Sequence, residues 1–217
     1  SHGETRRIGE KHILPELGER LADAVTRGDV TRFIDSIGAP VMARAVHAQL
    51  SAFYSWALPR LDNLPANPCQ GAGRPAKPKA RDRVLSDAEV AALWRIAEAE
   101  PKPWGQAVQM LILTGQRRSE VFEAQRAEFD LEAALWTIPP HRAKNGVTHL
   151  VPLSAPAVGL LGGIDAVEGS PWLFPAAGAP ENPASGISKA VNRMRAALAK
   201  ELDADVAPWS LHDIRRT

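Results

Sequence analysis

The chain has 217 residues, of which 45% are hydrophobic, and this is enough to form one large core or two smaller ones. Its formal net charge of +1 does not by itself indicate a nucleic-acid-binding protein. The apolar runs are far shorter than the roughly 20 residues that a membrane span needs. With no secretory signal and a single cysteine, the sequence predicts a cytoplasmic protein with no membrane partner and no internal disulfide.

Residues 1–66 show a helical pattern throughout and are predicted to form a small all-helical domain. The inward faces of three helices are expected to consist of Leu14, Leu17 and Leu21, then Val30, Phe33, Ile34 and Ile37, then Val41, Ala45, Ala48, Ala52 and Trp56. Arg44 and His47 lie outside the third stripe, where they face either DNA or water. Tyr54, the only tyrosine, sits in an aromatic helical stretch, so it is expected to pack rather than to react.

Residues 67–84 have the Gly, Pro and Ala content of a linker between two domains. The basic excess of the chain is concentrated here, because residues 70–83 carry five basic side chains and one acidic one. The basic residues are Arg74, Lys77, Lys79, Arg81 and Arg83. Such a segment is either solvated or lies along a phosphate backbone.

A second domain is predicted over residues 85–217, beginning with a helix that has a capping box made by Ser86 and Glu89. Pro103 opens a further helix, whose apolar run ends at Gly115. The chain then passes directly to two arginines at the start of another helix, predicted over residues 117–124.

Arg117 and Glu120 are three residues apart and share one face of this helix, whereas Arg118 is turned roughly 100° away. A guanidinium held rigidly beside a helix start is suited to binding phosphate oxygens. Taken alone, the stretch is better explained by a helix with a Gly cap and a surface Arg–Glu pair, and only the rest of the chain favours an anion site.

Beyond residue 129 the pattern changes from helical to extended, with strands expected at residues 135–138 and 148–153. Asn145 and Gly146 between them are a strong hairpin signal, which puts Lys144 at or beside the turn. The flanking His141 and His149 are expected to be surface residues of this hairpin.

The rest of the chain is predicted to form a short buried strand at residues 172–174 and a long helix at residues 185–202. Ser210 can cap a last helix that puts His212 and Arg215 on one face. The fold class is therefore mainly α with a small antiparallel β-sheet.

The sequence contains no Gly-rich phosphate loop, no paired-cysteine or His-Glu-x-x-His metal signature and no Gly-x-Ser-x-Gly elbow. Four separated basic residues remain as candidates for chemistry. Arg117 in Thr-Gly-x-Arg-x-x-Glu, Lys144 on a hairpin, and His212 with Arg215 in His-x-x-Arg resemble the catalytic motifs of tyrosine recombinases, the phage integrase family.

The resemblance covers nearly the whole chain and extends to the integrases of prophages and genomic islands, through stretches such as Trp-Thr-Ile-Pro and Leu-His-Asp-Ile-Arg-Arg-Thr. Residues 1–66 resemble the helical core-binding domain of that family, residues 67–84 its interdomain linker and residues 85–217 its catalytic domain. It implies double-stranded attachment-site DNA as substrate in the bacterial cytoplasm and a tetramer of protomers on that DNA. Accessory DNA-bending or excisionase proteins are further implied partners.

The implied chemistry is strand cleavage and rejoining through a 3′-phosphotyrosyl intermediate, without a cofactor. Arg117 and Arg215 would stabilise charge on the non-bridging phosphate oxygens. His212 would bind the same phosphate and assist proton transfer. Lys144 would protonate the leaving 5′-oxygen, and Glu120 would orient the first motif.

Other basic residues are expected to contact phosphates outside the reacting one, with solvation as the alternative. They are Arg44, Arg74, Lys77, Lys79, Arg81, Arg83, Arg118, Arg142 and Arg216.

In this family the nucleophilic tyrosine follows the His-x-x-Arg motif by some tens of residues, and no tyrosine follows Arg215 here. We therefore expect that the C-terminal segment is missing and that the 217-residue species binds DNA without cleaving it. A catalytically inactive relative that occupies attachment sites is the alternative, although it would not need Lys144 and His212 so placed. A type IB topoisomerase is less consistent with the core-binding domain.

Overall fold

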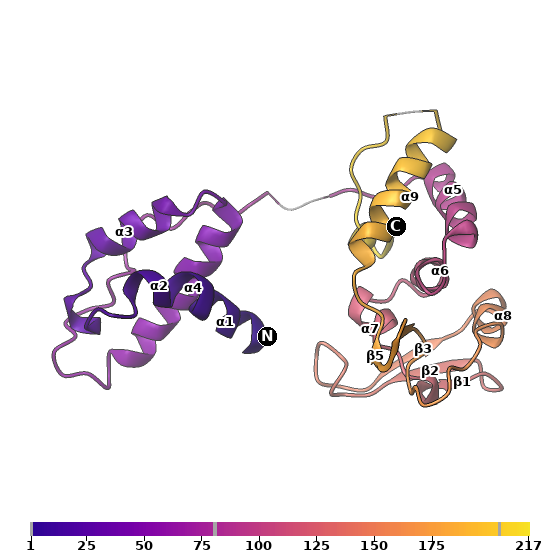
Figure 1. Cartoon of the computed structure of the whole chain (residues 1–217), viewed down its shortest axis with the longest axis horizontal. Helices are drawn as coiled ribbons and strands as arrows, with labels where there is room; N and C mark the ends of the chain where they lie inside the picture. Colours follow the sequence, from indigo (N-terminus) through magenta and orange to yellow (C-terminus); the bar gives the residue numbers. More distant parts are fainter. Residues whose placement is uncertain (1, 80–81, 204) are drawn as a thin grey trace. The chain divides into compact units, whose positions relative to one another are not determined.

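The computed structural model describes residues 2–79, 82–203 and 205–217. The chain divides into two compact units, Ser1–Arg81 and Asp82–Thr217, each with its own hydrophobic core (Figure 1). Arg81, one of the basic residues expected to contact DNA, lies outside the described residues. The predicted fold class, mainly α with a small antiparallel sheet, is confirmed.

In the described part of the first unit, all regular secondary structure is helical, and residues 58–79 are irregular. Its elements in chain order are α1 (His2–Ile8), the π-helix η1 (Gly9–Ile13), α2 (Leu14–Leu17), the 3₁₀-helix η2 (Ala22–Ala24), α3 (Arg27–Ser36) and α4 (Pro40–Ala57). Thr26 caps α3 through a reciprocal capping box with Asp29. Proline is the first residue of α4, where its missing N–H costs no helical hydrogen bond.

The buried face of α4 is not the predicted one. Val41 and Trp56, from the expected stripe, are 66% and 57% exposed. The buried residues are Ala43, Val46, His47, Leu50, Tyr54 and Ala57. Leu14 and Leu21 are likewise exposed rather than buried. Because α4 carries apolar residues on more than one side, its sequence pattern does not determine which side meets the core.

Part of the predicted linker packs in the first unit. Asn67, Cys69 and Ala72 are buried, and the Asn67 side-chain amide donates to the carbonyl of Ser51 (2.9 Å) and the hydroxyl of Ser55 (3.0 Å). These bonds hold the chain against α4, so the expected linker does not begin at residue 67. The Gly and Pro content indicated irregular backbone correctly but carried no information on its burial.

The helices of the second unit follow the predictions closely. They are α5 (Asp87–Ala99), α6 (Trp104–Thr114), α7 (Arg118–Phe122), α8 (Ala155–Gly162), α9 (Ile187–Glu201) and α10 (Leu211–Ile214), with a 3₁₀-helix η3 at Arg126–Glu128. The capping box of Ser86 and Glu89 is present. Gly115 ends α6 in the left-handed conformation, with a φ of 59°.

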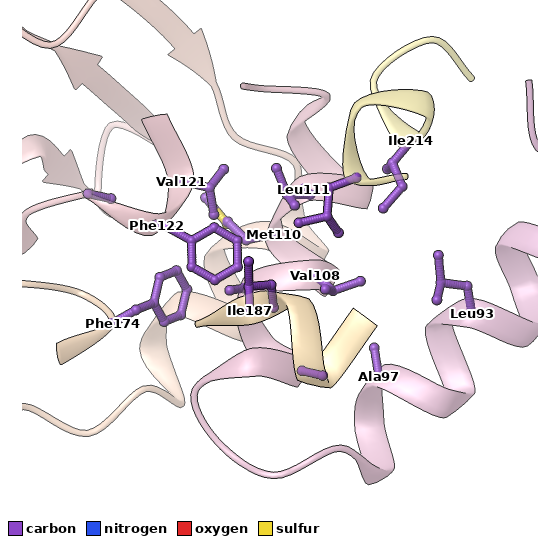
Figure 2. Close-up of a cluster of buried hydrophobic side chains, with 14 of the residues drawn as sticks. Leu93, Ala97, Val108, Met110, Leu111, Val121, Phe122, Phe174, Ile187 and Ile214 are labelled. Atoms are coloured by element: carbon purple, nitrogen blue, oxygen red, sulfur yellow. The ribbon is translucent and has the colours of Figure 1, made fainter. Parts of the chain in front are cut away.

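The core of this unit lies among α5, α6, α7 and α9, where Leu93, Val108, Leu111 and Phe122 are buried (Figure 2). Residues from distant parts of the chain, including Phe174 and Ile214, close the same cluster. This packing fixes the ends of α6 and α10 in the same rigid body, since α10 contacts α6.

The sheet has the order β1-β2-β3 and is antiparallel, with strands β1 (Phe129–Asp130), β2 (Leu135–Ile138) and β3 (His149–Pro152). Ile138 pairs with His149, so residues 139–148 form the connection that carries Lys144.

The strand predicted at residues 172–174 is wrong. Trp172 makes only an isolated bridge with Gln125, and the second sheet consists of β4 (Pro175–Ala176) and β5 (Ala179–Pro183). Leu173 and Phe174 are nevertheless buried as predicted, because their side chains belong to the core of this unit. Their backbones bond to Ala124 and Ala184, which lie outside any strand.

Candidate active site

Arg117 occupies the N-cap of α7, and Glu120, three residues on, holds it in two ways. The Glu120 carboxylate accepts the backbone N–H of Arg117 (2.9 Å) and its Nη1 (2.6 Å). Glu120 is only 1% exposed. Burial by itself raises the pKa of this carboxyl, but the hydrogen bonds from Arg117 and the charges of Arg117 and Arg215 outweigh it, so the pKa lies below its ordinary value.

Arg215 reaches the same place from the end of the chain. Its Nη1 donates to the backbone carbonyl of Gly115 (2.9 Å), two residues before Arg117. The short helix α10 is held by a capping box in which the Asp213 carboxylate accepts the backbone N–H and the hydroxyl of Ser210, both at 2.8 Å. The two arginine motifs therefore meet at the turn between α6 and α7.

A cavity of about 500 Å³ opens beside this turn. Its lining includes Arg117, Lys144 and His212, so three of the four predicted catalytic residues share one space. Among the described residues that line it, none is acidic, whereas Arg118 and Arg195 add two further guanidinium groups. The arrangement is suited to a phosphate diester, which carries one negative charge and offers oxygen acceptors.

Lys144 projects from an exposed turn. Gly146, with a φ of 68°, closes this turn by donating its N–H to the carbonyl of Ala143 (3.0 Å). On the opposite arm of the connection, His149 is an exposed surface residue as expected and makes a hydrogen bond between its Nε2 and Oε1 of Gln116 (3.1 Å). Lys144 is thus carried by the sheet, whose strand β3 contacts the segment next to Arg117 through His149.

Three arginines that were expected to contact DNA are engaged within the protein. Arg142 is buried in an ion pair with Glu128, in which both side chains are 7% exposed, and this differs from the expected phosphate contact. Arg83 pairs with Glu89, and Arg216 lies 3.4 Å from Asp213.

The remaining basic residues of the expected DNA-binding set are more accessible. Arg118 is exposed and lines the cavity. In the first unit, Arg74, Lys77 and Lys79 are exposed, and Arg44 donates to the carbonyl of Pro75 (2.6 Å), which holds this basic segment against α4.

The pKa of His47 on α4 is lowered by its surroundings. Its burial lowers its pKa, and the charges of Arg74 and Arg44 lower it further.

Tyr54 has the structural role that its surroundings predicted. It is buried in the first core, and its hydroxyl donates to the carbonyl of Ala22 (3.2 Å). Burial raises the pKa of this hydroxyl. Neither its position nor its ionisation suits it to act as a nucleophile.

Sequence reasoning missed the contribution of α9 to the cavity. Ser188, Asn192 and Arg195 line it from this helix, at spacings of four and three residues. That spacing is the signal that could have identified a polar face opposite the buried stripe of α9. Arg195 is held by Trp209, whose carbonyl accepts from its Nε (2.9 Å) and whose ring lies beneath its guanidinium.

Metal and membrane features are absent from the part of the chain that the structure describes. No group of three or more His, Cys, Asp and Glu side chains there is arranged to hold a metal ion. In the same residues, no helix combines the length and apolar character needed to cross a bilayer.

Comparisons with known structures give the same fold over almost the entire chain. Lambda integrase, as a dimer bound to a COC′ core site, superimposes with a TM-score of 0.72 and 20% identity, covering 98% of this chain and 78% of that one. The Tn1549 transposon integrase, in complex with circular intermediate DNA, gives a TM-score of 0.69 and 15% identity over 99% of this chain and 78% of that one.

Comparison of sequences identifies the family. The putative protein IntB of Escherichia coli (strain K12) is 28% identical over 172 residues, which is 70% of this chain and 43% of IntB, so the chain spans less than half of that relative. The sequence pattern of the phage integrase family matches residues 83–217, which hold the cavity and its basic side chains. The chain belongs to the phage integrase family and is thus a tyrosine recombinase family member.

Proposed function

We propose that this protein is a site-specific DNA recombinase that cleaves and rejoins strands through a 3′-phosphotyrosyl intermediate. The observation that carries the proposal is the convergence of Arg117, Lys144 and His212 on one cavity without acidic lining, with Arg215 bound to the adjacent turn. These residues come from three separate segments of sequence. If Arg117 and Glu120 formed only a surface ion pair, nothing would require Lys144 and His212 to lie beside them.

In the proposed reaction, a tyrosine oxygen attacks the scissile phosphorus as the bond to the 5′-oxygen breaks. Arg117 and Arg215 stabilise the charge on the non-bridging oxygens. His212 binds the same phosphate and assists proton transfer, and Lys144 gives a proton to the leaving 5′-oxygen. The buried Glu120 keeps Arg117 oriented. The 5′-hydroxyl of a second strand then attacks the phosphotyrosine and releases the tyrosine.

The nucleophile in this proposal is a tyrosine outside the 217 residues, because Tyr54 is buried and hydrogen-bonded within the first core. The 217-residue species itself is therefore proposed to bind DNA without cleaving it. The same burial supports the alternative function, a relative that occupies attachment sites without chemistry.

The proposed substrate is double-stranded attachment-site DNA of a prophage or genomic island in the bacterial cytoplasm. Lambda integrase has been seen as a tetramer bound to a Holliday junction, with a TM-score of 0.72 to this chain over 64% of its own length. That likeness supports a tetramer on DNA as the working assembly, with DNA-bending or excisionase proteins as further proposed partners. Arg118 and the basic segment around Arg74, Lys77 and Lys79 are proposed to contact the DNA backbone.

The test compares the 217-residue species with the product of the complete gene. Duplexes selected by binding from a random-sequence pool serve as DNA, and covalent adducts are detected on denaturing gels. We expect both proteins to bind, and only the complete product to form an adduct. Substitution Arg117→Ala or Arg215→Ala should abolish the adduct and leave binding largely intact.

Two outcomes would contradict the proposal in different ways. A complete product that binds but never forms an adduct would favour the binding-only alternative. Normal adduct formation by both arginine variants would show that the site is assigned to the wrong residues.

A further inference from the structure

The connection that carries Lys144 begins with a buried ion pair. Arg142 donates a hydrogen bond from Nη2 to Oε2 of Glu128 (2.8 Å), and its Nε lies 2.7 Å from Oε1 as a charge contact without hydrogen-bond geometry. The indole N–H of Trp136 also donates to Oε2 (2.9 Å). Both charged side chains are 7% exposed, which leaves the pair almost entirely shielded from solvent.

The same guanidinium touches the segment that holds Arg117. Nη2 of Arg142 donates to the backbone carbonyl of Glu120 (2.9 Å), and the carboxylate of Glu120 in turn holds Arg117. Lys144 is only two residues from Arg142, a separation that spans at most about 7 Å of chain. A short series of direct contacts therefore connects the lysine turn with the first arginine motif.

The position of the pair divides the connection into a fixed part and an exposed part. The backbone N–H groups of Arg142 and Ala143 both donate to the carbonyl of Pro139 (3.0 Å each), so the chain up to residue 143 is tied to the body. Residues 144–150 are all exposed. Arg142 is thus the last strongly held side chain before Lys144.

Stability alone is a weak reason for such a pair. Removing two charges from water offsets much of their attraction, and apolar residues of similar volume often stabilise a core equally well. A guanidinium nitrogen that donates both to a carboxylate and to a backbone carbonyl instead fixes the direction and distance between these two groups. The geometry therefore suits a side chain whose role is to hold neighbouring groups in place.

We propose that Arg142, held by Glu128, is a positioning residue for the recombination reaction: it fixes the root of the lysine turn against Glu120 so that Lys144 reaches the phosphate bound by Arg117. The inference rests on the proposed function. Arg142 itself touches no DNA in this role. Its loss is expected to impair the step that depends on Lys144, which is protonation of the leaving 5′-oxygen.

The test uses the complete gene product and two DNA substrates, one ordinary and one with sulfur in place of the scissile 5′-oxygen. With the second substrate, the tyrosine oxygen–phosphorus bond forms while the phosphorus–sulfur bond breaks, and the thiolate leaves without needing a proton. Arg142→Gln is expected to slow cleavage of ordinary DNA by about 100-fold, the effect of roughly 1 Å of misplacement. It should cleave the sulfur-containing DNA at close to the unsubstituted rate.

Three variants act as controls. Lys144→Ala should show the same rescue by sulfur, whereas Arg117→Ala should be slow on both substrates. Arg95→Gln removes a solvent-exposed arginine–glutamate contact, to Glu201, elsewhere in the same unit and should leave both rates unchanged.

The outcomes separate the two proposals. Equal slowing of Arg142→Gln on both substrates, or no slowing on either, would overturn the positioning role. If Arg142→Gln fails to fold, Arg142→Lys decides instead, because it keeps the charge but lacks the guanidinium that reaches Glu128 and the carbonyl of Glu120 together. It should then show a smaller defect that sulfur also rescues, and a defect that sulfur does not rescue would overturn the role. Absence of cleavage by the unsubstituted protein on either DNA would instead refute the proposed function.

Discussion

Arg117 owes its orientation to a single neighbour on the same turn of chain. The Glu120 carboxylate accepts from both the backbone and the guanidinium of Arg117, and it is buried beneath them. A buried carboxylate without such donors would be protonated more readily. The hydrogen bonds from Arg117 therefore keep Glu120 ionised despite its burial. The residue that binds phosphate in our proposal is thus held before any DNA arrives.

Replacing the Glu120 carboxylate should make the free energy of unfolding less dependent on pH in the acidic range. The pKa of Glu120 lies below its value in the unfolded chain, so its stabilisation is fully present above the ordinary carboxyl pKa and is lost as pH falls through the folded-state pKa. At pH 7, Glu120→Gln should therefore lower the free energy of unfolding by about 2 kcal/mol and so unfold at a lower temperature than the original protein. In thermal melts between pH 7 and pH 3 this difference should shrink, and a difference that is independent of pH would contradict the assignment.

A substitution at Tyr54 tests whether this buried tyrosine has only a structural role. Tyr54→Phe removes one hydrogen bond, to Ala22, and keeps the buried ring. We expect a loss of about 1 kcal/mol in the free energy of unfolding, measured by urea denaturation, with DNA binding unchanged. In the complete gene product, adduct formation should also be unchanged. Loss of the adduct in this variant would mean that the nucleophile has been misidentified.

At the scale of elements, the turn between α6 and α7 is the point where the site is assembled. Gly115 ends α6 with a φ of 59°, and its carbonyl accepts the guanidinium of Arg215. An L-residue with a side chain adopts this conformation only with strain. The glycine therefore sets the direction in which the chain leaves α6 and the point at which Arg215 is bound.

Substituting this glycine should separate backbone strain from steric clash. A Cβ added at Gly115 would meet nothing within 4 Å, so Gly115→Ala tests the positive φ alone. We expect a loss of about 1 kcal/mol in thermal unfolding and a weaker hold on Arg215. Gly159→Ala, inside α8 and also without close neighbours, is the matched control and should stabilise by roughly 0.5–1 kcal/mol. Equal effects at both glycines would contradict the role of the left-handed conformation.

At the scale of the whole molecule, the near-neutral net charge does not reveal that basic residues are concentrated in two places. The described basic segment of the first unit is exposed at Arg74, Lys77 and Lys79, whereas in the second unit Arg117, Arg118, Lys144 and Arg195 line one cavity. Each phosphate neutralised by a lysine or arginine releases counterions, so the affinity for DNA should fall steeply with salt.

The salt dependence can be assigned to individual residues. Lys77→Gln should weaken binding similarly for all DNA sequences and reduce the slope of log affinity against log salt by about one. Lys102→Gln, which removes a lysine paired with Asp165 instead, should leave the slope unchanged. Affinities measured by fluorescence anisotropy between low and moderate salt check both expectations. An unchanged slope for Lys77→Gln would show that this segment is solvated rather than bound to phosphate.

The sequence by itself determined the features that depend on a few neighbouring residues. The capping box of Ser86 and Glu89, the end of α6 at Gly115, the extent of α9 and the strand pair around Lys144 all follow from hydrogen bonds or periodicity among residues close in sequence. The residue types and spacing of the motifs were also sufficient to predict the family, which the match over residues 83–217 confirms.

Only the tertiary structure decided which partner each side chain meets at long range. It buried Arg142 against Glu128 rather than exposing it to DNA, turned a different face of α4 to the core, and joined Arg215 to Gly115 across 100 residues. An arginine has the same local pattern whether its guanidinium pairs with a carboxylate, a carbonyl or a phosphate. The choice depends on which acceptor the packing of the rest of the chain brings within about 3 Å.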